Sequence, residues 1–237
     1  MIASGGAPIA AEVLEFLQIA FCCRRIEGYG MTETCAGSLH TQIHDPEAGH
    51  VGGPMANVKL RLKDIPDMNY LSTDKPPRGE ICFWGPSITK GYFRNEVKTK
   101  EAFHGDWLMS GDVGMFLPNG SVKIIDRAKH IFKLSQGEYI APEKLENIYV
   151  QSSWIQQAWI HGDSLHDFIL LFAVLDPAKT KDLDEEEIKG RVLESITELA
   201  AANKLNALEK PKNMRLFTEM WTVESGILTP TLKLKRA

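Results

Sequence analysis

The chain has 237 residues, of which 43% are hydrophobic and 24% charged, a composition typical of a folded globular protein with a substantial core. Its 27 basic and 31 acidic residues give a net charge of −4, so it lacks the clustered basic excess of a nucleic-acid-binding protein. The four cysteines, Cys22, Cys23, Cys35 and Cys82, form no CxxC pair, which argues against a zinc site or a disulfide framework.

The first residues, the hydropathy and the cysteines of the sequence bear on the location of the protein. Met1 is followed by small and polar residues rather than by a basic region and an apolar run, so we expect no secretory signal and no secretion. No run of about 18 apolar residues is present to span a membrane. Unpaired thiols fit a reducing, cytosol-facing compartment.

The first part of the chain begins with a loop and a helix and then becomes rich in short strands. Ser4–Pro8 is typical of a strand end that turns into a helix, in which Pro8 suits an early position. From Val51 to Lys123, short apolar runs alternate with turns, and this texture predicts a β-rich subdomain. The expected strands include Val58–Leu62, Glu80–Trp84 and Val122–Ile125, and Asp64–Pro77 is expected to be an exposed loop.

After Asp126 the pattern predicts a small α+β domain of roughly 110 residues. The expected elements are a helix opened by Ala141-Pro142-Glu143, strands over Gln157–His161 and Phe168–Leu175, a helix over Glu185–Ala202 and a strand over Met214–Phe217. We place the boundary between Asp126 and Arg127, which gives domains of residues 1–126 and 127–237. The fold class is therefore α/β followed by α+β.

The segment Gly28-Tyr29-Gly30-Met31-Thr32-Glu33 is a candidate phosphate loop. Glycines allow the backbone to approach a ligand closely. Tyr29 offers an aromatic face for a base, Thr32 a hydroxyl for a phosphate, and Glu33 a hard oxygen for Mg²⁺. The alternative is a tight turn with a core tyrosine.

Three further motifs follow in order. Trp107–Asp112 places an acid just after a glycine turn, where its carboxylate could accept ribose hydroxyls or cap its own backbone. The basic, glycine-containing stretch from Ile125 to Glu143 suits a hinge between domains. Leu228–Arg236 is a basic segment that could serve a site or be a solvated tail.

The order and spacing of these motifs, with Arg78-Gly79-Glu80-Ile81 and Gly91-Tyr92 between them, resemble the adenylate-forming superfamily of acyl-CoA synthetases, adenylation domains and luciferases. Ile131–Ile140 and Leu228–Lys233 resemble the eukaryotic long-chain fatty acyl-CoA synthetases in particular. The resemblance covers essentially the whole chain. It implies the end of the large AMP-binding domain, followed by a small mobile C-terminal lid domain.

The resemblance also implies residue roles. Those of the nucleotide site are Gly5, Gly6, Ala7 and Pro8 at the adenine pocket, Tyr29 and Gly30 against adenine, Thr32 at the α-phosphate, Glu33 on Mg²⁺, and Asp112 and Arg127 on the ribose. Asp126 is implied as the hinge, Gly137 as a neighbour of the pantetheine channel, and Lys233 as the lysine that contacts the α-phosphate and the carboxylate. The implied ligands are ATP, Mg²⁺, CoA and a long-chain fatty acid.

The Ser/Thr/Gly-rich phosphate loop that the family carries upstream is absent from this sequence. We therefore expect a fragment of a ligase that is inactive alone, that needs the missing N-terminal part of the enzyme, and whose first part exposes apolar surface. The alternative is a truncated, non-catalytic module that binds nucleotide or a partner. Luciferase-like oxidation is disfavoured by Lys133–Ile140, whereas acceptors other than CoA stay open. Peripheral association with endoplasmic reticulum, mitochondria or peroxisomes would depend on segments outside this sequence.

Overall fold

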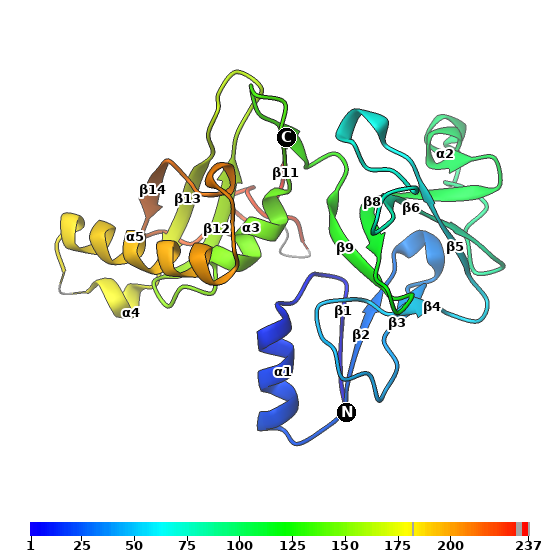
Figure 1. Cartoon of the computed structure of the whole chain (residues 1–237), viewed down its shortest axis with the longest axis horizontal. Coiled ribbons are helices and arrows are strands. Elements are labelled where there is room, and N and C mark those ends of the chain that lie inside the picture. The colour runs from blue at the N-terminus through cyan, green and yellow to red at the C-terminus, as the bar shows by residue number, and fades with distance from the viewer. Residues whose placement is uncertain (182, 231–233, 237) are drawn as a thin grey trace. The chain divides into compact units, whose positions relative to one another are not determined.

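The computed structural model describes residues 1–181, 183–230 and 234–236. These residues form two compact units, Met1–Ala128 and Lys129–Ala237 (Figure 1). The domain boundary expected from sequence, between Asp126 and Arg127, stays a prediction. Each unit is described by itself below.

The first unit begins with a parallel β-α-β arrangement. Strands β1 and β2 pair in parallel, with Gly5 opposite Gly28, and helix α1 connects them. Strands β3 and β4 extend this sheet in antiparallel fashion, in the order β1-β2-β3-β4. The bounds are β1 Ile2–Gly5, α1 Ala11–Ala20, β2 Arg25–Tyr29, β3 Leu39–His40 and β4 Gly53–Pro54.

A second, antiparallel sheet completes this unit and confirms the β-rich texture expected there. Its order is β5-β6-β8-β7, and β9 also pairs with β8. The bounds are β5 Lys59–Lys63, β6 Arg78–Trp84, α2 Glu96–Ala102, β7 Phe103–His104, β8 Trp107–Phe116 and β9 Val122–Arg127. Buried side chains of both sheets and of the segments between them form one core, which comprises Leu39, Val51, Val58, Ile81, Phe83 and Val122. This shared core holds the end of β2 near the middle of β8.

The second unit is a sheet with helices on one face. β12 pairs antiparallel with β13, and β13 pairs in parallel with β14. Helices α3 and α5 contribute to the main core on one side of this sheet (Figure 1). The bounds are β10 Phe132–Lys133, β11 Tyr139–Ile140, α3 Pro142–Tyr149, β12 Ile155–His161, β13 Leu170–Leu175, α4 Pro177–Thr180, α5 Glu185–Ala202 and β14 Asn213–Phe217.

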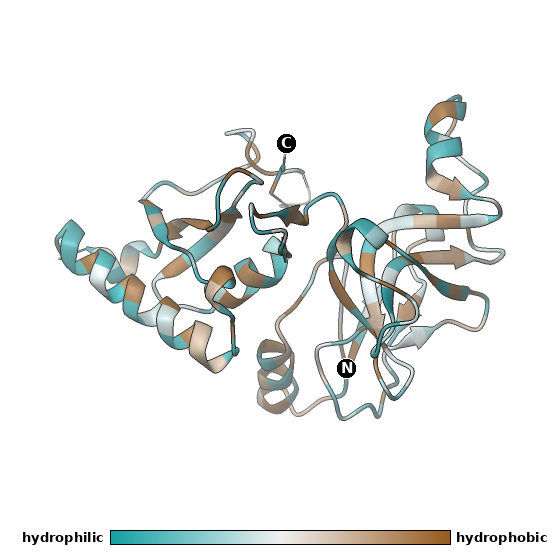
Figure 2. Ribbon diagram, turned by 45° about the horizontal axis from the view of Figure 1, so that its top comes forward, coloured by the Kyte–Doolittle hydropathy of each residue, from teal (hydrophilic) through white to brown (hydrophobic). Residues whose placement is uncertain are grey.

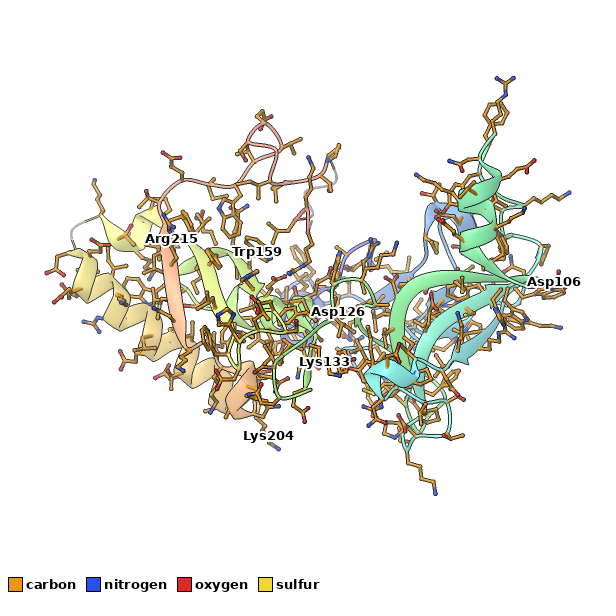
Figure 3. The ribbon with its side chains drawn as sticks, turned by 90° about the horizontal axis from the view of Figure 1, so that it is seen from above. Asp106, Asp126, Lys133, Trp159, Lys204 and Arg215 are labelled. Atoms are coloured by element: carbon orange, nitrogen blue, oxygen red, sulfur yellow. The ribbon has the colours of Figure 1, made fainter. Side chains whose placement is uncertain are left out.

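The other face of this sheet is covered by the chain that follows β14. Trp221 and Leu228 are buried there with Val174, and Trp159 packs against them. Figure 3 shows α5 on one side of the sheet and this C-terminal segment on the other, with Trp159 on the side of the segment. Both faces of the sheet therefore carry apolar cores.

Candidate functional site

The loop after β2 is tightly folded around Gly30. A Cβ atom at Gly30 would lie 1.6 Å from the carbonyl oxygen of Ala36, so no larger residue fits there without moving the backbone. The amides of Thr34 and Ala36 both donate to the carbonyl of Met31, at 3.0 and 3.1 Å. The resulting 3₁₀ turn, Thr32–Thr34, leaves Thr32 exposed and Glu33 half-buried.

The segment Gly5–Pro8 lies next to this loop. Strand β1 ends at Gly5, opposite Gly28 in the neighbouring parallel strand. Gly6 has φ +80, and a Cβ atom there would meet open space. The carboxyl ends of adjacent parallel strands form the edge at which α/β sheets commonly bind ligands. The four residues predicted at the adenine pocket, Gly5, Gly6, Ala7 and Pro8, thus lie at the edge that carries Tyr29.

Tyr29 is bonded to a carboxylate far along the chain. Its hydroxyl donates to Oδ2 of Asp112, 83 positions away, and its ring packs against Phe83 at 6.0 Å between centroids. Burial, together with the nearby Asp112 charge, raises the pKa of Tyr29 well above its ordinary value. The phenol therefore stays protonated and acts as a donor.

Asp112 lies inside strand β8 and not after a turn, so that part of the sequence prediction is wrong. The Ser110-Gly111-Asp112 wording resembles a turn because Gly111 takes a positive φ of 74, but here this conformation occurs within the strand. The Gly111 amide donates to Oε1 of Glu80 at 3.1 Å, and the Asp112 amide donates to the Ser110 hydroxyl at 3.0 Å. The irregular strand thus fixes the Asp112 side chain.

Arg127 completes this cluster. It lies opposite Asp112 in the β8–β9 ladder, and its Nε is 3.3 Å from Oδ1 of Asp112. The Arg127 side chain is 53% exposed and that of Asp112 only 13%. Asp112 therefore contacts both Tyr29 and Arg127, three residues that were predicted from separate motifs.

Glu33 is held by a residue to which sequence reasoning gave no role. The Tyr92 hydroxyl donates to Oε1 of Glu33 at 2.6 Å, and the Thr89 amide donates to the Glu33 carbonyl at 2.8 Å. The hydrogen bond to Glu33 raises the pKa of Tyr92, and partial burial adds a smaller effect in the same direction. The Gly91-Tyr92 motif was the available signal, but its contact with Glu33 spans 59 positions.

The Glu33 carboxylate is chemically suited to Mg²⁺. Mg²⁺ in nucleotide sites is usually bound by one or two carboxylates together with substrate phosphates and water. Glu33 supplies such an oxygen on a turn, next to the exposed Thr32. The residues present thus fit the metal that the sequence implies.

Three further residues, Asp126, Gly137 and Lys233, have roles predicted from sequence. Asp126 is 2% exposed, and its Oδ1 accepts the Arg127 amide at 2.6 Å. Gly137, in the second unit, has a φ of +94 in the turn between β10 and β11. Its amide donates to the Leu134 carbonyl at 2.9 Å. Lys233 lies outside the described residues. The hinge role of Asp126, the channel role of Gly137 and the catalytic role of Lys233 stay predictions.

Comparison with known proteins defines the class. Residues 1–93 match the family of AMP-binding enzymes. The chain is similar in structure to the adenylation domain of a carboxylate reductase from Mycobacterium chelonae, with a TM-score of 0.87 and 30% identity over 98% of this chain and 35% of that one. A didomain of a carboxylic acid reductase from Segniliparus rugosus in complex with AMP gives a TM-score of 0.86 and 31% identity, over 99% and 32%. The chain belongs to the adenylate-forming superfamily.

Within this superfamily the chain is similar to long-chain acyl-CoA synthetases. It is 43% identical to the peroxisomal long chain acyl-CoA synthetase 7 of Arabidopsis thaliana, over 98% of this chain. It is 41% identical to long-chain-fatty-acid–CoA ligase 1 of Homo sapiens, over 100% of this chain. In both comparisons the chain spans 36% of the relative's length. Among the described helices, none has the length and apolar character needed to cross a membrane.

Proposed function

We propose that this chain forms part of an ATP-dependent long-chain fatty acid–CoA ligase. The observation that carries the proposal is the contact of Tyr29, Asp112 and Arg127 at the edge of the first sheet, in a chain 41–43% identical over its length to long-chain acyl-CoA synthetases. The hydrogen bond between Tyr29 and Asp112, 83 positions apart, supports a site to which both motifs contribute. The whole enzyme would join a fatty acid to CoA and release AMP and pyrophosphate.

The cluster can recognise a nucleoside by ordinary hydrogen bonding. A carboxylate accepts from two vicinal ribose hydroxyls, and Arg127 provides donors beside it. The ring of Tyr29 gives adenine a stacking surface, and Gly5, Gly6, Ala7 and Pro8 lie at the same strand edge. Gly30 allows the backbone to pass close to the ligand.

The phosphates would lie over the turn that carries Thr32 and Glu33. Thr32 is exposed and has a hydroxyl that can donate to an α-phosphate oxygen. When bound, Mg²⁺ supplies positive charge to the phosphates as the fatty-acid carboxylate attacks. Glu33, whose carboxylate accepts a hydrogen bond from Tyr92, would bind the Mg²⁺ ion.

Residues of the second unit would act in turn. We assign Lys233 to the α-phosphate and carboxylate during adenylation, where removal of one such contact costs on the order of 10²–10³ in rate. Rotation about Asp126 would then replace Lys233 with the channel beside Gly137, through which the CoA thiol reaches the acyl-adenylate. Such a rotation gates the second step and does not itself perform chemistry. In the cell we expect the enzyme on a cytosol-facing membrane of endoplasmic reticulum, mitochondria or peroxisomes.

Pyrophosphate release is the first test. It would be measured with ATP, Mg²⁺, a long-chain fatty acid and CoA, on this chain and on the same chain extended by its upstream coding sequence. We expect activity in the extended protein, and its loss in Lys233→Ala and Glu33→Ala. No release from either protein, despite AMP binding by equilibrium dialysis, would contradict the ligase and favour a non-catalytic nucleotide-binding module.

A further inference from the structure

The second unit contains a buried ion pair that the proposed function does not use. Glu146, on α3, is 9% exposed as a residue, and its Oε1 accepts a hydrogen bond from Nη2 of Arg236 near the C-terminus. Both side chains are 11% exposed. A buried ionic pair costs desolvation on both sides, so it contributes through geometry rather than as a simple gain in stability.

The pair is tied to the central sheet by two backbone groups of one residue. Oε1 of Glu146 accepts the Ile160 amide at 2.7 Å, and Nη1 of Arg236 donates to the Ile160 carbonyl at 3.2 Å. Ile160 is fully buried in β12. Helix α3, strand β12 and the C-terminal segment therefore meet at a single point. Because Arg236 uses two nitrogens for two acceptors, a lysine could not reproduce the arrangement.

Further contacts hold the same segment, one set to the sheet and one within the segment. The side chain of Gln157 exchanges two hydrogen bonds with the backbone of Trp221, at 2.8 and 3.1 Å. Leu228 forms a β-bridge with Leu234, and the Lys235 amide donates to the Ile227 carbonyl at 2.9 Å. Leu228 and Leu234 are thus paired with each other, and the Arg236 contact lies two residues beyond Leu234.

From this geometry we propose that Glu146 and Arg236 are positioning residues for Lys233. They hold the described residues that follow this lysine in the chain, Leu234 to Arg236, and so limit where it can reach. The inference rests on the adenylation role given to Lys233 under the proposed function. A side chain that must be positioned at a reacting phosphate with a precision of about 1 Å depends on such an anchor, since a displacement of this size can lower the rate about 10²-fold.

The first arm of the test uses the chain itself and needs no activity. Hydrogen exchange of the Lys235 amide would be compared between the wild type and Glu146→Gln, with Glu143→Gln as the matched control. Glu143 lies on the same helix but pairs with His130 at 2.8 Å. We expect exchange of Lys235 about tenfold faster in Glu146→Gln only, since a charge-assisted bond is lost, while amides of β13 stay unchanged. Unchanged exchange at Lys235 would overturn the anchor.

The second arm uses the upstream-extended protein and separates the two half-reactions. Glu146→Gln and Arg236→Gln should lower ATP–pyrophosphate exchange by about ten- to a hundredfold, with Arg236→Lys between them and the wild type. Thioester formation from supplied acyl-adenylate should stay within about twofold of the wild type. Equal losses in both half-reactions would mean a structural role only and would overturn the proposal. If Lys233→Ala keeps full exchange, the proposed function fails instead, whatever the first arm shows.

Discussion

The two units differ in how completely each covers its own apolar surface. In the second unit, helices α3 and α5 cover one face of the sheet, and the C-terminal segment covers the other with Trp221 and Leu228. In the first unit, α1 buries Leu14 fully but leaves Phe16 66% exposed and Ile19 79% exposed. Figure 2 shows this helix as a hydrophobic element. The apolar surface expected from sequence is thus present on α1, and such a surface marks a place of contact.

The largest expected effect tests the closed core of the second unit. Leu171 is fully buried in β13, so Leu171→Ala should lower the free energy of unfolding of this unit by about 3 kcal/mol. Urea unfolding followed by tryptophan fluorescence measures this when Trp84 and Trp107 of the first unit are replaced by Phe, because Trp154, Trp159 and Trp221 all lie in the second unit. A loss below about 1 kcal/mol would mean that this core is looser than the structure describes.

A smaller effect on stability is expected in the first unit, at the buried Glu27. Burial raises the pKa of Glu27 to about 7, although the charge of Arg25 acts in the opposite direction. A carboxyl with a raised folded-state pKa contributes fully below its unfolded value of 4.5 and loses that contribution as the pH rises through about 7. Glu27→Gln should therefore stabilise the first unit by about 2 kcal/mol at pH 8 and have little effect at pH 4. Urea unfolding of the wild type and the variant at both pH values checks this, and a destabilised variant at pH 8 would contradict it.

The smallest expected effect concerns α1. Because Ile19 already faces solvent, Ile19→Ser should change the free energy of unfolding by no more than about 0.5 kcal/mol. Urea unfolding of the wild type and the variant measures this difference. The same replacement at the buried Leu14 serves as the destabilising control. A large destabilisation by Ile19→Ser would mean that the helix face is covered in solution.

Local signals allowed some elements to be predicted closely. The helix Glu185–Ala202 has the predicted bounds, because Asp184 caps its first turn and apolar residues recur at helical spacing. Strand β8 was missed because Gly111 and its neighbours resemble a turn. Strands β3 and β4 have only two residues each, which is too short for a periodic pattern.

The sequence indicated residues of the candidate site but not the contacts between them. The motifs indicated Tyr29, Asp112 and Arg127 separately, and the register of β8 with β9 brings the last two together. The bonds from Tyr29 to Asp112 and from Tyr92 to Glu33 span 83 and 59 positions. Such pairings depend on how two sheets share a core, and no local pattern encodes them.

The hydrogen bond from Tyr29 to Asp112 has a consequence for ligand affinity. A free aspartate side chain samples several rotamers, and fixing it when a ligand arrives costs conformational entropy. Here the phenol and the Arg127 guanidinium already hold the carboxylate before any ligand is present. The ordering is completed when the chain folds, so a ligand that reaches this carboxylate meets a preorganised acceptor and dissociates more slowly than it would from a mobile one.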